Sequence, residues 1–149
     1  MLEKPNKKFI GKFYCTLDEK SRLTIPSKFR ELVPGDEGSK VLVISRGKEH
    51  CLYLYTPDYF DWIIEQLGQQ EPGPQQRNLI RYYSSESENL KVDRVGRVQM
   101  PPHYLETLGD SKSVFVVGGL THIEVWKPED FEKIMKDAND TYQNGPWQL

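Results

Sequence analysis

An internal repeat is the strongest constraint that this sequence places on its fold. Residues 18–26, with the sequence DEKSRLTIP, align with residues 93–101, DRVGRVQMP, at an offset of 75 positions. Further along, VLVIS at 41–45 matches VFVVG at 114–118, and both are short runs rich in β-branched residues that predict buried strands. Self-similarity of this kind is typical of a fold built from equivalent units. We therefore expect two halves with the same order of elements.

The repeat continues into a helix at the end of each half. The segment CLYLYTPDYF at 51–60 matches HIEVWKPEDF at 122–131, at an offset of 71. Apolar residues then recur at i, i+3, i+4 and i+7, which is the stripe of an amphipathic helix. Each half therefore predicts a strand, a turn, a strand, a short helix, two strands and a helix. The two stripes consist of Phe60, Ile63, Ile64 and Leu67, and of Phe131, Ile134, Met135 and Ala138.

The predicted domain organisation depends on the linker between the halves and on the small size of each half. GQQEPGPQ at 68–75 is rich in Gly, Pro and Gln, and QRNLIRYYS at 76–84 predicts a helix that leads into the second half. Halves of about 50 residues with such short strands would be marginal alone, so we expect strands from both to complete one small barrel. After residue 138 we expect a loosely ordered tail in which Trp147 could dock. The predicted boundaries are 12–58 for the first repeat with its helix to 67, 68–86 for the linker and helix, and 87–130 for the second repeat with its helix to 138.

Composition excludes several classes of protein. The chain has 149 residues and a formal net charge of −2, from 20 Lys and Arg against 22 Asp and Glu. Its most apolar stretch, Val114 to Leu120, is too short to span a bilayer, and no apolar segment follows the charged N-terminus as in a secretory signal. Cys15 and Cys51 make neither a disulfide framework nor a zinc cluster. We therefore expect a cytoplasmic protein without a membrane segment.

The charge is unevenly distributed along the chain. Residues 1–50 carry a net charge of +4 and residues 76–101 carry +2, whereas residues 51–75 and 102–149 carry −4 each. A mildly acidic protein can bind a polyanion when its basic segments share one face, because the local potential matters more than the net charge. We expect the acidic segments to lie on faces turned away from such a partner.

The two Asp-to-Arg turns carry the chemistry that favours nucleic-acid binding. Asp18 precedes Arg22 by four residues, and Asp93 precedes Arg97 in the same way, with Gly96 between them. The carboxylate can accept hydrogen bonds from the turn backbone, and an Arg held by that Asp would present a planar donor fork to a phosphate or a guanine edge. Taken alone, each pair could simply close its turn. Nearby residues that could add phosphate contacts are Lys12, Lys20, Lys28, Arg30, Lys91 and Arg94.

These residues carry a family resemblance. FIGKFYCTLDEKSRLTIPSKFRE and the second turn, DRVGR, resemble the MraZ family of bacterial transcription regulators, and the similarity runs from Phe9 to about Met135. The resemblance implies two AbrB/SpoVT-like modules in a mainly β fold with short helices, a double-split, swapped-hairpin barrel whose subunits assemble into rings. It also implies binding to short direct repeats of double-stranded DNA upstream of the division and cell-wall gene cluster, and hence a nucleoid-associated location. We predict the DNA-binding residues Asp18, Lys20, Arg22, Lys28, Asp93, Arg94 and Arg97.

The first turn departs from the family pattern at one position. Ser21 stands where the family usually has Gly, whereas the second turn keeps Gly96. If this position needs a positive φ, Ser21 costs roughly 1 kcal/mol or shifts the turn. The role of Arg22 is therefore less firmly predicted than that of Arg97.

Two other classes of function remain as alternatives. An enzyme would use paired carboxylates or a Cys–His pair, but no motif of a known nucleophile, metal or phosphate site accompanies those residues, so we expect no catalysis, cofactor or small-molecule substrate. An AbrB/antitoxin-like barrel that binds protein without specific DNA binding would share the fold, because fold does not determine function. The candidate catalytic groups are Asp18, Asp93, Cys15, Cys51, His50, His103 and His122.

Overall fold

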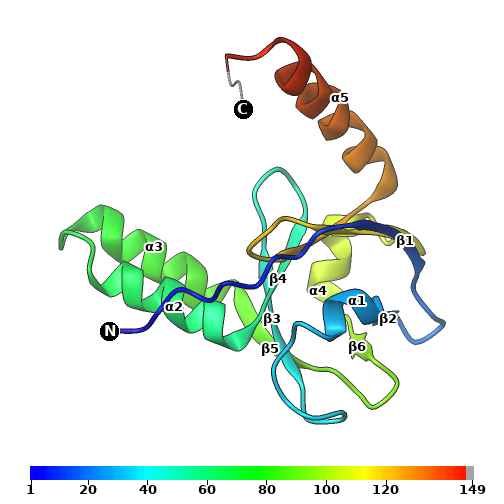
Figure 1. Cartoon of the computed structure of the whole chain (residues 1–149), viewed down its shortest axis with the longest axis horizontal. Helices are drawn as coiled ribbons and strands as arrows, with labels where there is room; N and C mark the ends of the chain where they lie inside the picture. The colour runs from blue at the N-terminus through cyan, green and yellow to red at the C-terminus, as the bar shows by residue number, and fades with distance from the viewer. Residues whose placement is uncertain (147–149) are drawn as a thin grey trace.

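The order of elements is the same in both halves of the chain, as the repeat predicts (Figure 1). The structure is a computed structural model and describes residues 1–146. The first half contains β1 (Lys12–Thr16), β2 (Arg22–Thr24), α1 (Ser27–Arg30), β3 (Val41–Arg46), β4 (Leu52–Tyr55) and α2 (Pro57–Gly68). After α3 (Pro74–Ser85), the second half contains β5 (Ser87–Lys91), β6 (Arg97–Gln99), α4 (Pro102–Leu105), the short 3-10 helix η1 (Glu106–Leu108), β7 (Ser113–Gly118), β8 (Ile123–Trp126) and α5 (Pro128–Asn144).

The strands of the two halves interleave, which confirms the shared core. A six-stranded antiparallel sheet has the order β1-β7-β8-β4-β3-β5. Its first strand, β1, pairs with β7 of the second half, and β5 of the second half pairs with β3 of the first. If each strand is replaced by its counterpart in the repeat, the same order results in reverse. The sheet therefore has the pseudo-two-fold symmetry that the repeat implies.

The mainly β class with short helices is confirmed, but the strands do not close into a barrel. Within the described residues, β1 and β5 are the two edges of the six-stranded sheet, and β2 pairs with β6 in a separate two-stranded sheet. The physical reason is that the Asp-to-Arg turns direct the chain away from each edge strand, so that β2 and β6 meet each other instead. We call the pair β2–β6 the ribbon.

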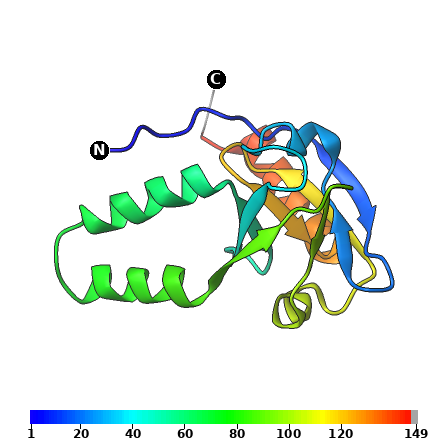
Figure 2. The ribbon, with the colours of Figure 1, turned by 90° about the horizontal axis from the view of Figure 1, so that it is seen from below.

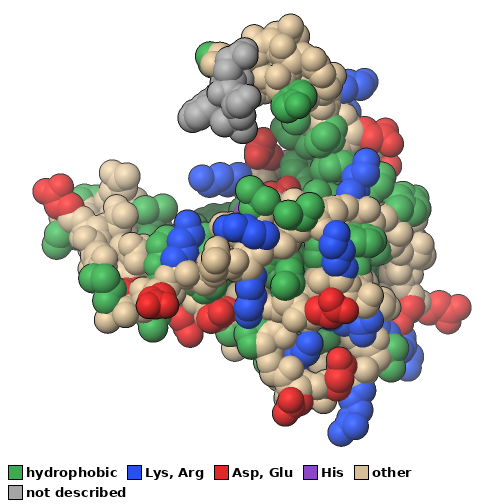
Figure 3. Space-filling view, in the orientation of Figure 1, with side chains coloured by type: hydrophobic (Ala, Val, Ile, Leu, Met, Phe, Trp, Pro, Cys, Tyr) green, Lys and Arg blue, Asp and Glu red, His purple; other side chains and the backbone are tan. Residues whose placement is uncertain are grey.

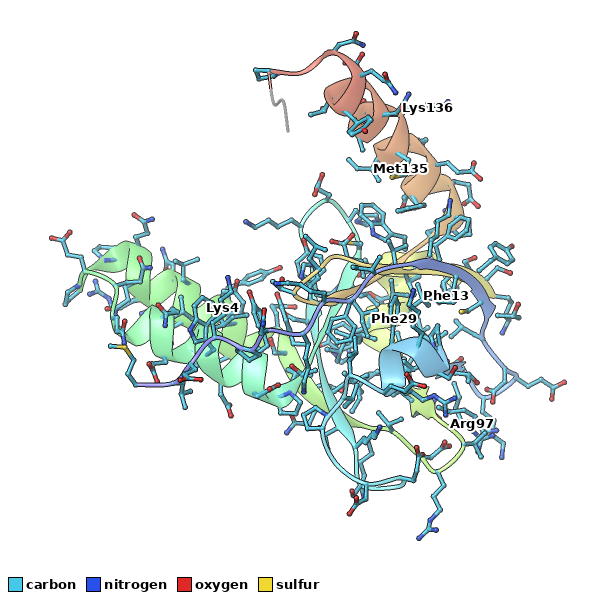
Figure 4. All side chains as sticks on the ribbon, viewed as in Figure 1. Lys4, Phe13, Phe29, Arg97, Met135 and Lys136 are labelled. Carbon is cyan, nitrogen blue, oxygen red and sulfur yellow. The ribbon has the colours of Figure 1, made fainter. Side chains whose placement is uncertain are left out.

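The main core lies between the six-stranded sheet and the ribbon, and equivalent residues build it from both halves. Their side chains are at most 1% exposed, and edge-to-face contacts from Phe9 and Phe13 to Phe29 extend the packing. Burial of these apolar groups is the main stabilising force of the fold. Figure 4 shows Phe13 and Phe29 close together in this region. The equivalent buried pairs are Leu23 and Val98, Ile25 and Met100, and Phe29 and Tyr104.

The C-terminal end of the chain differs from the expectation of a loosely ordered tail. Helix α5 does not end at residue 138 but continues to Asn144, because no Gly or Pro interrupts it before Gly145. Trp147 lies outside the described residues. At the other end, residues 1–8 lie along α2 (Figure 1). The contacts are a hydrogen bond from the Leu2 N–H to Glu65, Lys4 over the ring of Trp62, and an ion pair between Lys7 and Asp58.

Helices α2 and α3 form a hairpin that projects from the strands, as Figure 2 shows. The side chain of Thr56 caps the first turn of α2, with Pro57 at its start. Helix α3 has no fully buried residue. None of the helices within residues 1–146 has both the length and the apolar character to cross a membrane.

Candidate nucleic-acid interface

Asp18 organises the first turn through three hydrogen bonds. One carboxylate oxygen, Oδ1, accepts the backbone N–H groups of Lys20 and Arg22, at 2.9 Å each. The other oxygen, Oδ2, accepts the Nε–H of Arg22 at 2.7 Å. A backbone hydrogen bond from Ser21 to the Asp18 carbonyl, at 2.9 Å, closes the turn. The Asp side chain therefore shapes the backbone and also holds the guanidinium of Arg22.

The second turn repeats this geometry. Asp93 accepts the backbone N–H groups of Val95 and Arg97 through Oδ1, at 3.0 and 2.9 Å, and the Arg97 Nε–H through Oδ2, at 2.8 Å. The N–H of Gly96 donates to the Asp93 carbonyl at 2.9 Å. The two turns are thus the same hydrogen-bonded unit at two places in the chain.

The electrostatics of both turns favour an ionised Asp. The pKa of Asp18 lies below its ordinary value, chiefly because the backbone N–H of Arg22 donates to the carboxylate, and the Arg22 side chain and the Lys20 N–H add to the effect. The pKa of Asp93 is lowered in the same way, first by the backbone N–H of Arg97. Each carboxylate is therefore charged at neutral pH and keeps its arginine in place.

The fixed arginines keep donors for a partner. Each uses only its Nε–H on the carboxylate, and neither forms a hydrogen bond through its terminal Nη groups within residues 1–146. The side chains of Arg22 and Arg97 are 28% and 30% exposed. A half-exposed guanidinium of fixed orientation can donate two parallel hydrogen bonds to a phosphate or to the edge of a guanine.

The ribbon places both arginines on one face. The register pairs Arg22 with Gln99 and Thr24 with Arg97. Because side chains of directly paired residues point to the same side of a sheet, these four residues share the outer face. Leu23 and Val98 point to the other side and are fully buried. Figure 4 shows Arg97 at this end of the molecule, apart from Met135 and Lys136 on α5.

The left-handed position of each turn has a different environment, which explains the difference in sequence. Ser21 has φ 59° and Gly96 has φ 96°, so the positive φ expected here is present in both turns. At Gly96, an added Cβ would collide with Nη1 of Arg30, which donates to the Val95 carbonyl at 3.0 Å. The repeat counterpart of Arg30 is Leu105, which lines a small cavity together with Ser21. Only the second turn therefore lacks room for a side chain.

The other predicted cations are only partly gathered at the turns. Lys20 is exposed on the first turn and Arg94 on the second. Arg94 also lies against Gly38, in the loop between α1 and β3. Lys28 is exposed on α1, but its Nζ lies beside Gly11, away from the turn. Lysines, arginines and acidic residues are intermingled over this end of the molecule in Figure 3.

Two of the cations proposed as phosphate contacts have other contacts in the structure. Lys12 lies over the rings of Phe115 and Phe131, with Nζ 5.5 and 5.8 Å from their centroids, beneath α5. Arg30 packs against the second turn and positions it. Neither position could be inferred from nearness in the sequence, since both contacts join distant segments.

Two outer-face residues of the ribbon were not predicted as site residues. Gln99 donates from Nε2 to the Lys20 carbonyl at 2.7 Å and so links β6 to the first turn, and Thr24 is exposed beside Arg97. The signal was present in the alternation of a strand, which puts residue i+2 on the same face as residue i. It becomes usable only when the pairing of β2 with β6 is known.

Four of the seven candidate catalytic groups make structural contacts. The buried Cys51 thiol donates to the Lys48 carbonyl at 3.0 Å, and burial raises its pKa above the ordinary value, which disfavours the reactive thiolate. His122 contacts Glu124 and Thr121, at 3.0 Å each. Asp18 and Asp93 are engaged by their own turns.

Comparison with known proteins agrees with the repeat and the turns. The family model described as "MraZ protein, putative antitoxin-like" matches residues 9–79 and 84–144. The transcriptional regulator MraZ of Dictyoglomus thermophilum is 33% identical over 132 residues, which cover 88% of this chain and 87% of that protein. The transcriptional regulator MraZ of Syntrophomonas wolfei is 33% identical over 138 residues, which cover 91% and 92%. With two matched segments and relatives aligned along nearly their whole length, this chain belongs to the MraZ family.

Proposed function

We propose that this protein is a sequence-specific DNA-binding transcriptional regulator. Its family membership supports the class of function, since the relatives are named transcriptional regulators. The observation that carries the proposal is the pair of equivalent turns, in which Asp18 and Asp93 hold Arg22 and Arg97 on one face of the ribbon. Within residues 1–146 the terminal Nη groups of both arginines have no hydrogen-bond partner, so both can donate to a ligand.

The ribbon is suited to the major groove of DNA. That groove admits a two-stranded β-ribbon, and a fixed arginine can donate to both O6 and N7 of a guanine. Arg22 and Arg97 would read bases, and Gln99 between them is an amide of the kind that pairs with adenine. Lys20, Arg94 and, at the border of the site, Lys28 would contact phosphates, which position the protein without reading sequence.

Assembly of several copies would compensate for the small number of contacts in one chain. One subunit with two arginine turns and a few lysines would bind weakly, and in a salt-dependent way. We propose a ring-like homo-oligomer that contacts consecutive short direct repeats upstream of the division and cell-wall gene cluster, including the protein's own gene. Each bound turn raises the effective concentration of the next. The acidic segments 51–75 and 102–149 would face away from the DNA, and the protein would associate with the nucleoid.

The test is a binding titration against DNA from upstream of the protein's own gene and a scrambled fragment, at two salt concentrations. We expect tight, salt-sensitive preference for the native fragment. The double variant Arg22→Ala/Arg97→Ala should lose that preference, by tenfold or more, because each bidentate arginine–guanine contact contributes about 1–3 kcal/mol of discrimination. A matched control, Lys48→Ala/Lys133→Ala, removes two exposed cations outside the ribbon and should bind like the wild type.

Equal and weak binding to both fragments, unchanged by the arginine substitutions, would contradict the proposal. The Asp–Arg pairs would then be turn architecture only. In that case the better description is a protein-interaction module without specific DNA binding, and a protein partner should be sought.

A further inference from the structure

Helix α5 stands away from the sheet for most of its length (Figure 1). Its first turn is anchored by Phe131, which is 6% exposed and contacts the rings of Phe115 and Trp126. Farther along the same stripe, Met135 is 44% exposed and Tyr142 is 82% exposed. A helix of this length depends on packing for its stability in water. The apolar stripe of α5 is therefore left without a cover within the described residues.

A groove runs beside this stripe. It has a volume of about 550 Å³, and its apolar lining includes Trp126, Ile134 and Met135. Its charged lining consists of Glu49, Glu124 and Lys12, which leaves a net charge of −1. Figure 3 shows hydrophobic side chains gathered along α5 and on the strands beneath it. The groove has the size and lining of a docking site for a helix with apolar and basic residues.

The first half of the repeat shows how a second helix can pack against this apolar stripe. Helix α2 is the counterpart of α5, and in the first half α3 packs against it. Phe60, the counterpart of Phe131, contacts the ring of Tyr83 at 6.4 Å, and Gln76 of α3 donates to the Leu67 carbonyl at 2.9 Å. Within residues 1–146, no helix follows α5 that could do the same for the second half.

The net charges of the helices indicate which of them could bind in the groove beside α5. Helix α5 contains five acidic and two basic residues, a net charge of −3, and α2 also carries −3. Helix α3 contains Arg77 and Arg81 and no acidic residue, a net charge of +2. Its exposed side presents Ile80 between these two arginines, at helical spacing. A second α5 or an α2 in the groove would bring like charges together, whereas α3 brings opposite ones.

We propose that the groove beside α5 binds the exposed side of α3 of a second copy of this chain. Ile80 would cover the apolar stripe, and Arg77 and Arg81 would face the acidic residues Glu132 and Asp137 that flank it. The contact is heterologous, because it joins two different surfaces, and such contacts generate rings when the rotation closes. The inference rests on the proposed homo-oligomer and names its interface.

The test measures the mass of the assembly in solution without DNA, by sedimentation or light scattering. Wild type is expected to exceed the monomer mass of 17.4 kDa several-fold. Arg77→Glu/Arg81→Glu and Glu132→Arg/Asp137→Arg should each reduce the assembly to the monomer. All four positions are exposed, so circular dichroism should show an unchanged fold. The matched control Lys112→Glu/Lys133→Glu changes the charge by the same amount as the first variant, on exposed residues of neither face, and should assemble like the wild type.

Mixing the two monomeric variants tests the heterologous contact directly. The unchanged α5 groove of the first variant matches the unchanged α3 of the second, and the two altered surfaces also carry opposite charges. The mixture should therefore assemble like the wild type, with the two variants alternating. Combining all four substitutions in one chain should restore the full assembly, because the charges are exchanged. A wild-type monomer, full assembly of either variant alone, or a mixture that stays monomeric would overturn the inference. These measurements contain no DNA, so their failure is distinguishable from a failure of specific DNA binding.

Discussion

At the scale of single residues, the two turns show how one side chain decides what its neighbour can be. Arg30 fills the space over the second turn and donates to Val95, so Gly96 is required there by contact as well as by its φ of 96°. In the first turn the shorter, apolar Leu105 is the counterpart of Arg30, and Ser21 is accommodated at φ 59°. Ser21 therefore has the energetic cost of a left-handed backbone conformation, but its side chain does not collide with a neighbour.

Gly96→Ala tests this account. We expect a loss of about 1–3 kcal/mol in the free energy of unfolding, because the left-handed cost adds to the displacement of Arg30. Ser21→Ala is the matched control, and it should change stability by no more than about 0.5 kcal/mol, since its backbone strain is already present. Urea denaturation of both variants checks the difference. Equal effects of the two substitutions would contradict the role given to Arg30.

The lowered pKa values make a second prediction. A carbon-13 NMR titration should find Asp18 and Asp93 titrating below their ordinary value of 3.8, because backbone N–H groups of the turns favour the charged form. A folded-state pKa below the unfolded one contributes stability above the unfolded value, and this contribution is lost as the pH falls through the folded pKa. The turns should therefore hold through mildly acidic pH and open only in strong acid. A titration at or above 3.8 would show that the carboxylates are not held as described.

At the scale of elements, the ribbon is the least self-sufficient part of the fold and the part with the proposed function. Its strands have three residues each, and their pairing depends on the burial of Leu23 and Val98 against the core. The outer face can therefore be polar while the inner face supplies the stability. Because one face is buried and the other is free for polar residues, the four candidate DNA-contacting residues of the outer face fit on two strands of three residues each.

Leu23→Ala should cost about 2–5 kcal/mol, the range for a buried leucine replaced by alanine. The neighbouring Thr24→Ala, on the exposed face of the same strand, should stay within about 0.5 kcal/mol and serves as its control. Thermal unfolding measures both. If Leu23→Ala were as mild as Thr24→Ala, the ribbon would not be anchored through its inner face.

At the scale of the whole molecule, the interleaved strands make the two halves one folding unit. The first half lacks the partner of β1, which is β7, and the second half lacks the partner of β5, which is β3. Neither half can satisfy its edge strands or complete the core between sheet and ribbon. The pseudo-two-fold symmetry also leaves one inequality, since α3 covers α2, whereas no helix within residues 1–146 covers α5 in the same way.

Fragments 1–85 and 86–149 test the single folding unit. We expect each fragment to be unfolded alone, because its edge strand and its ribbon strand have no partner and its share of the core is too small. Mixed in equal amounts, they should regain the circular dichroism of the intact chain. Cooperative unfolding by either isolated fragment would show an independent domain instead.

The sequence predicted most of the fold because the relevant signals are local. The stripe from Phe60 to Leu67, the repeat of the Asp-to-Arg turns and the positive φ at Ser21 all depend on residues within a few positions of each other. The predictions that the structure contradicts depend on contacts between segments that are distant in the sequence. The open sheet in place of a closed barrel depends on how strands of both halves pair. The packing of Lys12 under α5 depends in the same way on a segment far along the chain.

The sequence by itself determined each Asp–Arg unit, because an aspartate can reach the backbone and the arginine four residues later wherever that turn lies in a fold. Only the tertiary structure decided that the two arginines share a face. That result requires β2 to pair with β6 in one register, and a shift by one residue would turn one arginine toward the core. The register is set by the burial of Leu23 and Val98, two residues 75 positions apart whose contact no local pattern can specify.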